Sequence, residues 1–156
     1  MAGTDRFDRG RRMSAGVRPP APRPCASCPY RTDVPSGIWA STEYAKLPPY
    51  DRDTALQPVA LFLCHQNDPE SPQSRICAGW TACHGENLLA LRLAASRGHI
   101  DQATYDSAIN SRTDVEIFES GEAAARHGLD GINSPPPAAV RAIDKLTRRR
   151  TDLAPG

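Results

Sequence analysis

Seven cysteine and histidine side chains, which can bind metals in proteins, lie within one stretch of sixty residues, from position 25 to position 84. They are five thiols and two imidazoles, which are the groups that hold zinc ions and iron–sulfur clusters. In a Cys-x2-Cys turn both sulfurs lie on one side of a tight loop, so that both can reach one ion at about 2.3 Å. In chain order the seven are Cys25, Cys28, Cys64, His65, Cys77, Cys83 and His84.

The number of cysteines and the start of the chain favour metal binding over disulfide bonds. Five is an odd number and pairs poorly as a disulfide framework. The N-terminal arginines have no apolar stretch behind them, so we expect no secretory signal and predict the reducing cytoplasm as the compartment. The alternative is that these cysteines are simply small buried apolar residues. One tight pair and two Cys-His dipeptides in a chain this short favour a metal site.

Four ligands satisfy zinc, so some of the seven candidates would be left over. We expect the ligands to be Cys25, Cys28, Cys77 and one of Cys64 or Cys83. The imidazoles of His65 and His84 are the reserve ligands. Because Cys64 stands thirteen positions before Cys77, the spacing excludes a standard zinc finger.

Zinc and an iron–sulfur cluster compete for the same thiolates, and spacing alone separates them poorly. The adjacent histidines favour Zn²⁺, since neutral imidazole is a less usual cluster ligand. An iron–sulfur cluster that senses oxidants, partly shielded by Trp80, is the alternative. A zinc enzyme with a ligand position open to water is a second alternative.

Other catalytic signatures are missing from the sequence. No Gly-rich phosphate loop, paired-carboxylate signature or Ser-His-Asp pattern occurs. A nucleophilic Cys64 activated by His65 is disfavoured, because neighbours on an extended segment point to opposite faces. We therefore predict no catalytic residue, and we lean against an enzyme.

The elements that must carry the ligands divide the chain into an irregular N-terminal half and a helical C-terminal half. The apolar run from Val59 to Cys64 predicts a short strand, with a helical turn as the alternative. Residues 65–76 are polar, contain prolines and predict a loop. Capping residues, glycines and prolines predict helices over 42–47, 86–97, 101–109 and 120–128, and a last helix after Ser134.

The predicted fold is therefore small and mainly α. It has an irregular, metal-stapled N-terminal half with at most a short strand or hairpin and little core, followed by about four helices. In the helix before Pro48 we expect Trp39, Tyr44 and Leu47 to point inward. In the last helix, Val140, Ile143 and Leu146 share the apolar face.

Composition sets the domain boundaries and the classes of partner. Residues 1–24 are rich in arginine and proline and predict a disordered basic tail, followed by one metal-binding domain over 25–150 and a disordered C-terminus over 151–156. The net charge of +1 argues against a strongly basic nucleic-acid binder. The two basic ends could still contact a protein or nucleic-acid partner. No apolar run is long enough to cross a bilayer, so we expect no membrane partner.

Several phrases of the chain resemble an uncharacterised family, a domain of unknown function found in high-GC bacteria and their phages. They are CASCPYRTDVPSGIW, EYAKLPPYD, LFLCHQ, RICAGWTACHG and FESGEAAARHG, and the resemblance covers roughly residues 23–150. It implies that the five cysteines belong to one unit, and it carries no activity that can be transferred. Together these observations predict a zinc-binding cytoplasmic module with a binding or regulatory role.

Overall fold

The structure is a computed structural model, and it describes residues 17–66 and 72–149. Within these ranges the chain forms helices joined by irregular segments, with isolated bridges and no named strand. This confirms the prediction of a small, mainly α fold. The α-helices are α2 (Ser41–Tyr44), α3 (Ala78–His84), α4 (Leu89–Ser96), α5 (Gln102–Ile109), α6 (Gly121–Asp130) and α7 (Pro137–Arg149). The short 3-10 helices are η1 (Pro48–Asp51), η2 (Thr54–Leu56) and η3 (Gly85–Asn87).

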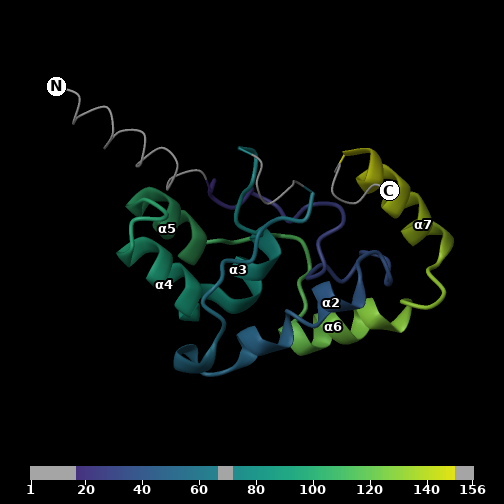
Figure 1. Ribbon diagram of the computed structural model, residues 1–156, viewed down its shortest axis with the longest axis horizontal. Helices are drawn as coiled ribbons and strands as arrows, with labels where there is room; N and C mark the ends of the chain where they lie inside the picture. Colours follow the sequence, from purple (N-terminus) through teal and green to yellow (C-terminus); the bar gives the residue numbers. More distant parts are fainter. Residues whose placement is uncertain (1–16, 67–71, 150–156) are drawn as a thin grey trace.

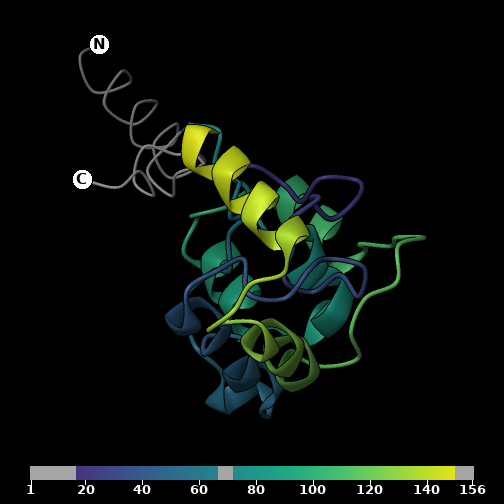
Figure 2. The same cartoon turned by 90° about the vertical axis from the view of Figure 1, so that its right-hand side faces the viewer.

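The helices form two groups and one outlying member. Helices α3, α4 and α5 lie together at one end of the molecule, and α2 and α6 lie side by side nearer the middle (Figure 1). Helix α7 lies on the outside, where Figure 2 shows it crossing the molecule toward the viewer. No helix among the described residues is long and apolar enough to cross a membrane. The irregular segments that carry most of the cysteines run between these helices.

The predicted caps of α5 and α6 and the predicted glycine after α4 are confirmed, whereas no side chain caps α2 and the helix predicted over 86–97 begins at Leu89. The Asp101 carboxylate accepts a hydrogen bond from the Thr104 backbone N–H at 2.8 Å and caps α5. The Ser120 hydroxyl accepts one from Ala123 and caps α6. Gly98 adopts a φ of 74° just after α4, a conformation that favours glycine.

The predicted end of α6 at Gly128 is wrong, because the helix continues to Asp130. Gly128 lies inside the helix and faces the ring of Tyr44, where a Cβ would come within 2.0 Å of the nearest ring carbon. The glycine therefore allows close packing of α6 on α2 and does not stop the helix. Tyr44, Trp39 and Leu47 are all buried, as predicted.

The predicted strand over Val59–Cys64 is also wrong. Only Leu63 pairs, in an isolated antiparallel bridge with Ile76. Two backbone hydrogen bonds flank that bridge, from Cys64 N–H to the Arg75 carbonyl at 2.8 Å and from Cys77 N–H to the Phe62 carbonyl at 2.9 Å. This contact is too short for a strand, yet it fixes Cys64 opposite Arg75 and Cys77 opposite Phe62.

The N-terminal half contributes many buried residues to the single hydrophobic core, which corrects the expectation that it would contain little apolar interior. Tyr30, Tyr50 and Phe62 are buried together with Trp80 of α3. The rings of Tyr30 and Phe62 meet edge to face at 5.9 Å, and those of Tyr50 and Trp80 at 5.3 Å. Aromatic pairs in this geometry add about 0.5–1.5 kcal/mol each beyond the area that they bury. Packing of aromatic side chains therefore helps to hold the irregular half in place.

Residues 1–16 and 150–156 lie outside the described ranges, and with them most of the predicted basic tail and the whole of the predicted C-terminal tail. Part of the predicted tail is described. Arg18 exchanges backbone hydrogen bonds with Ser74 and Ile76, and Pro24 is buried directly before the first cysteine. In the last helix Leu146 is buried as expected, whereas Val140 is 47% exposed.

Candidate metal centre

The structure brings four of the five cysteines together from three separate segments. The Sγ atoms of Cys28 and Cys77, forty-nine positions apart in the chain, lie 3.7 Å from each other. The Cys25 thiol interacts with the thiols of both Cys28 and Cys64. The four side chains thus form a continuous series in the order Cys64, Cys25, Cys28 and Cys77, which we call the thiol cluster. None of them is in a disulfide.

The distance between Cys28 and Cys77 has the size expected for two ligands of one ion. Four sulfurs arranged tetrahedrally at about 2.3 Å from a metal lie about 3.8 Å from one another. A disulfide would require about 2.05 Å instead. Within residues 17–66 and 72–149, however, no group of three or more His, Cys, Asp or Glu side chains is already arranged to hold a metal ion. The thiols are therefore close together without forming a complete coordination sphere.

Two tight turns and the Leu63–Ile76 bridge position the cluster. The first turn closes with a hydrogen bond from Cys28 N–H to the Cys25 carbonyl at 3.1 Å, and the next one with Arg31 N–H to the Cys28 carbonyl at 3.1 Å. Cys77 is the residue directly before α3, so its direction is set by the start of that helix. The four sulfurs are thus presented by turns and a helix start, with no strand involved.

Backbone N–H groups favour the thiolate form at three of the four cysteines. Cys25, Cys28 and Cys64 each accept a hydrogen bond from the backbone of the residue two positions later, and each bond lowers the pKa of its thiol. The same relation therefore occurs in both the Cys-x2-Cys turn and the Cys64 turn. The donors are the N–H groups of Ser27, Tyr30 and Gln66.

The pKa values of Cys25, Cys28 and Cys64 are nevertheless raised above the ordinary value of a thiol. The hydrogen bond with Cys28, together with burial, raises the pKa of Cys25 to about 11. For Cys28, contact with Cys25 lowers the pKa, but contact with Cys77 and burial outweigh it and raise the pKa well above its usual value. Contact with Cys25 and burial likewise raise the pKa of Cys64. A metal ion would displace the thiol protons, because thiolate is the form that coordinates.

Two arginines provide positive charge beside the cluster. The Arg75 guanidinium lowers the pKa of Cys64, and Arg31 interacts electrostatically with Cys28 and Cys25. Arg31 is itself held in place by a bidentate pair with Asp33, at 2.8 and 2.7 Å, and by the Pro24 carbonyl at 3.1 Å. A divalent ion with four thiolates would carry a charge of about −2, which Arg75 would offset in part, since the charge of Arg31 is already balanced by Asp33.

Cys83 is not brought to the thiol cluster. Burial, followed by the nearby Asp51 carboxylate, raises the pKa of its thiol to about 12. Among the described residues its sulfur interacts with none of the other four thiols. Of the two cysteines that the spacing left open, Cys64 contacts Cys25 in this structure and Cys83 does not.

The reserve ligand His84 is engaged elsewhere. Its Nε2 lies 3.1 Å from the Tyr30 hydroxyl, and its Nδ1 lies 3.9 Å from Asp51. Burial lowers the pKa of His84, and the Asp51 charge opposes that change. His84 is thus a buried polar partner of Tyr30 and lies apart from the thiol series.

The other reserve ligand, His65, is held against two aromatic rings. Its ring centroid lies 4.7 Å from that of Trp39 and 4.9 Å from that of Phe62. Its Nε2 lies 2.7 Å from a Glu43 carboxylate oxygen. This contact, followed by the ion pair with Lys46, lowers the pKa of Glu43 to about 2.

Gly79 lies in the phrase RICAGWTACHG, but nothing in the sequence indicates its packing role. A Cβ at this position would lie 2.4 Å from Cys28 Sγ and 2.8 Å from Tyr30 Cβ. The absence of a side chain lets α3 approach the first cysteine turn closely enough for Cys77 to meet Cys28. Its position two residues after Cys77 was the only signal available, and that signal does not distinguish a packing glycine from a turn glycine.

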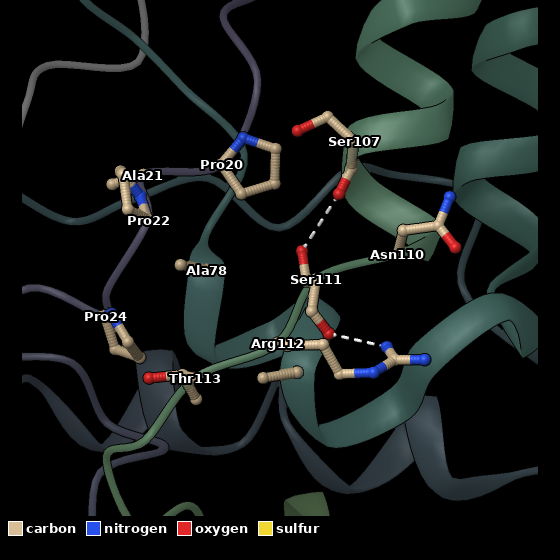
Figure 3. A pocket seen from close by; sticks show the side chains of 11 residues that line it. Pro20, Ala21, Pro22, Pro24, Ala78, Ser107, Asn110, Ser111, Arg112 and Thr113 are labelled. Carbon is tan, nitrogen blue, oxygen red and sulfur yellow. Dashed lines mark hydrogen bonds between the residues drawn. The ribbon is translucent and has the colours of Figure 1, made fainter.

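A pocket of about 230 Å³ lies between residues 20–24, α3 and the end of α5 (Figure 3). Pro24 precedes Cys25, and Ala78 follows Cys77. Among its described lining residues Arg112 is the one ionisable side chain, and its guanidinium donates to the Ser111 carbonyl at 2.8 Å. The remaining polar lining consists of hydroxyl and amide groups from Ser107, Asn110, Ser111 and Thr113. The pocket therefore offers no acid–base pair for catalysis.

Comparison with known proteins gives one match. A model described as "Family of unknown function (DUF6283)" matches residues 20–150. Neither the curated proteins nor the solved structures gave a match. The matched range includes all five cysteines and all described helices.

Proposed function

Since the chain belongs to the DUF6283 family of unknown function, we propose from the geometry of this member that it is a metal-binding module. The ion would be held by the thiol cluster, Cys25, Cys28, Cys64 and Cys77. Cys83, His65 and His84 would lie outside the coordination sphere. The function of the family is unknown, so the proposed role depends on the thiol cluster alone.

The observation that carries this proposal is the meeting of thiols from distant segments. Three independent pieces of backbone bring four cysteines into one series of contacts, and two of the sulfurs lie 3.7 Å apart. A free cysteine stabilises a core no more than another small apolar residue does. Packing alone therefore gives no reason for four thiols to lie next to one another. The repeated backbone hydrogen bonds to sulfur support the same conclusion, since they favour thiolate charge.

We propose Zn²⁺ as the ion. The separation of 3.7 Å between Cys28 and Cys77 suits two thiolates on one metal centre. In a cubane cluster each cysteine binds its own iron, so the ligand sulfurs lie farther apart. The alternative remains an iron–sulfur redox sensor, because two cysteines share each iron in a [2Fe–2S] cluster. His84 does not bear on this choice, since its two ring nitrogens face Tyr30 and Asp51.

The role that we propose is structural and regulatory, and not catalytic. Four thiolates fill every position of a tetrahedral zinc ion and leave none for water or substrate. That arrangement disfavours the zinc enzyme, our second alternative. We propose that the module acts in the cytoplasm of a bacterium or a phage-infected cell, with its basic ends contacting a protein or nucleic-acid partner.

The test is the metal content of protein purified without air. We expect one zinc per chain and no visible colour in the wild type and in Cys83→Ser, with the zinc lost in Cys28→Ser. Iron with sulfide and an absorption band at about 400 nm would instead support the cluster alternative. Absence of both metals from a folded protein, or loss of zinc in Cys83→Ser alone, would refute the thiol cluster as the site.

A further inference from the structure

The thiol cluster is asymmetric with respect to solvent. Cys28 and Cys77 are 1% and 3% exposed, whereas Cys25 and Cys64 are only partly buried. The cluster thus has a buried edge, Cys28 with Cys77, and an exposed edge, Cys25 with Cys64. A small solute can reach the second edge without disturbing the core.

The two edges also differ in how firmly they are packed. Cys28 lies directly against Gly79 and Tyr30, so its sulfur cannot move without displacing α3. The exposed edge is surrounded by polar groups instead. The Ser27 hydroxyl lies 3.7 Å from Cys25 Sγ, and the Gln66 side chain donates to that hydroxyl at 3.2 Å.

We propose that the exposed edge is a peroxide-sensitive switch, in which Cys25 and Cys64 form a disulfide and release the metal. This inference rests on the proposed function, because it concerns the same cluster with its ion bound. The oxidant is a hydroperoxide, such as hydrogen peroxide. The result of the switch is a protein without its ion, with a new covalent link between the first cysteine turn and the segment that follows Phe62.

The chemistry balances with hydrogen peroxide as the only co-reactant. One thiolate of the exposed edge attacks a peroxide oxygen, the O–O bond breaks, and a sulfenic acid and one water form after protonation. The second thiolate attacks the sulfenic sulfur, forms the S–S bond and releases hydroxide, which is protonated to a second water. In sum, two thiolates, one hydrogen peroxide and two protons give one disulfide and two waters. The ion then has two thiolates left and dissociates.

Cys83 is the matched control in the same chain. It is partly buried like the exposed edge, but a metal ion in the thiol cluster would not hold its sulfur as the reactive thiolate. It also lies outside the thiol cluster. Replacing it should therefore leave both the oxidation and the metal release unchanged.

The experiment follows zinc and disulfides together in full-length protein loaded with Zn²⁺. Hydrogen peroxide is added, released zinc is measured with a chromogenic chelator, and the protein is alkylated and digested with trypsin. One tryptic peptide contains Cys25 and Cys28, another contains Cys64, and a third contains both Cys77 and Cys83. Crosslinked peptides and their fragmentation spectra thus assign each disulfide.

We expect about one zinc released per disulfide formed, a crosslink between Cys25 and Cys64, and rebinding of zinc after reduction. Cys83→Ser should behave like the wild type. Zinc that stays bound under peroxide, or a disulfide through Cys28, Cys77 or Cys83, would overturn the switch and leave the metal site standing. Protein that cannot be loaded with zinc would refute the proposed function and the switch together.

Discussion

Replacing Gly79 with alanine tests the close approach on which the thiol cluster depends. The added methyl group would lie 2.4 Å from Cys28 Sγ and 2.8 Å from Tyr30 Cβ, both far shorter than van der Waals contact. Tyr30 is fully buried, so neither neighbour can swing into solvent. Either α3 or the first cysteine turn must shift, and Cys28 then separates from Cys77.

Whether Gly79→Ala raises or lowers the free energy of unfolding shows which of two opposing effects is larger. In an unobstructed helix, alanine is more favourable than glycine by up to about 1 kcal/mol. Overpacking in a well-filled interior costs about 1–3 kcal/mol. We therefore expect Gly79→Ala to lower the free energy of unfolding by about 1–2 kcal/mol, in spite of its better helix propensity. Because one of four ligands is displaced, zinc affinity should fall by about 10- to 100-fold.

Urea unfolding and competition with a chromophoric zinc chelator measure the two effects separately. Gly85→Ala is the matched control at the other end of α3. There a Cβ meets nothing within 4 Å, and the strain comes only from a φ of 62°. It should cost about 1 kcal/mol of stability and leave zinc affinity unchanged. A Gly79→Ala protein that is more stable than the wild type and binds zinc equally well would refute the packing argument.

Three further predictions concern the parts around the cluster. Removal of the metal with a chelator should lower the melting temperature but retain most of the helical circular dichroism signal. The reason is that the aromatic core and α4–α6 do not include the four thiols. Complete loss of the helical signal would contradict this prediction. Asp51→Ala should lower the free energy of unfolding in urea by about 1–2 kcal/mol without changing zinc content, because Asp51 accepts hydrogen bonds at 2.7 and 2.8 Å from the first backbone N–H groups of α6. Loss of zinc in that variant would place Asp51 in the metal site. Contacts with His65 and Lys46 lower the pKa of Glu43 from 4.5 to about 2, so this carboxylate stabilises the folded state above pH 4.5 and that contribution is lost as the pH falls through 2. Metal-free Glu43→Gln should therefore lose less stability than the metal-free wild type between pH 5 and pH 2, as measured by urea unfolding at each pH, and an unchanged pH dependence would count against the contact.

Helix boundaries could be predicted where a single side chain sets them. Asp101 and Ser120 cap their helices through local hydrogen bonds, which depend on residues only three positions away. Gly128 could not be assigned in the same way. Gly128 leaves room for the ring of Tyr44, which is distant in sequence. From the sequence alone, a glycine that allows such packing cannot be told from a glycine that ends a helix.

The apolar run at Val59 was misread for a similar reason. Its residues have the composition of a strand, but a strand requires a partner, and here residues 75–77 supply only an isolated bridge. The same contact brings Cys64 to the cluster. Spacing could not choose between Cys64 and Cys83, because the choice depends on this long-range pairing and on the start of α3. The aromatic core of the first half was underestimated, since Tyr30, Tyr50 and Phe62 lie in segments that follow no periodic pattern.

The central claim is that four thiolates share one ion, and X-ray absorption at the metal edge tests it most directly. For protein purified without air, we predict a zinc edge whose first shell contains four sulfurs at about 2.3 Å and no nitrogen or oxygen. A first shell that includes imidazole nitrogen or water, or one with fewer than four sulfurs, would contradict the account.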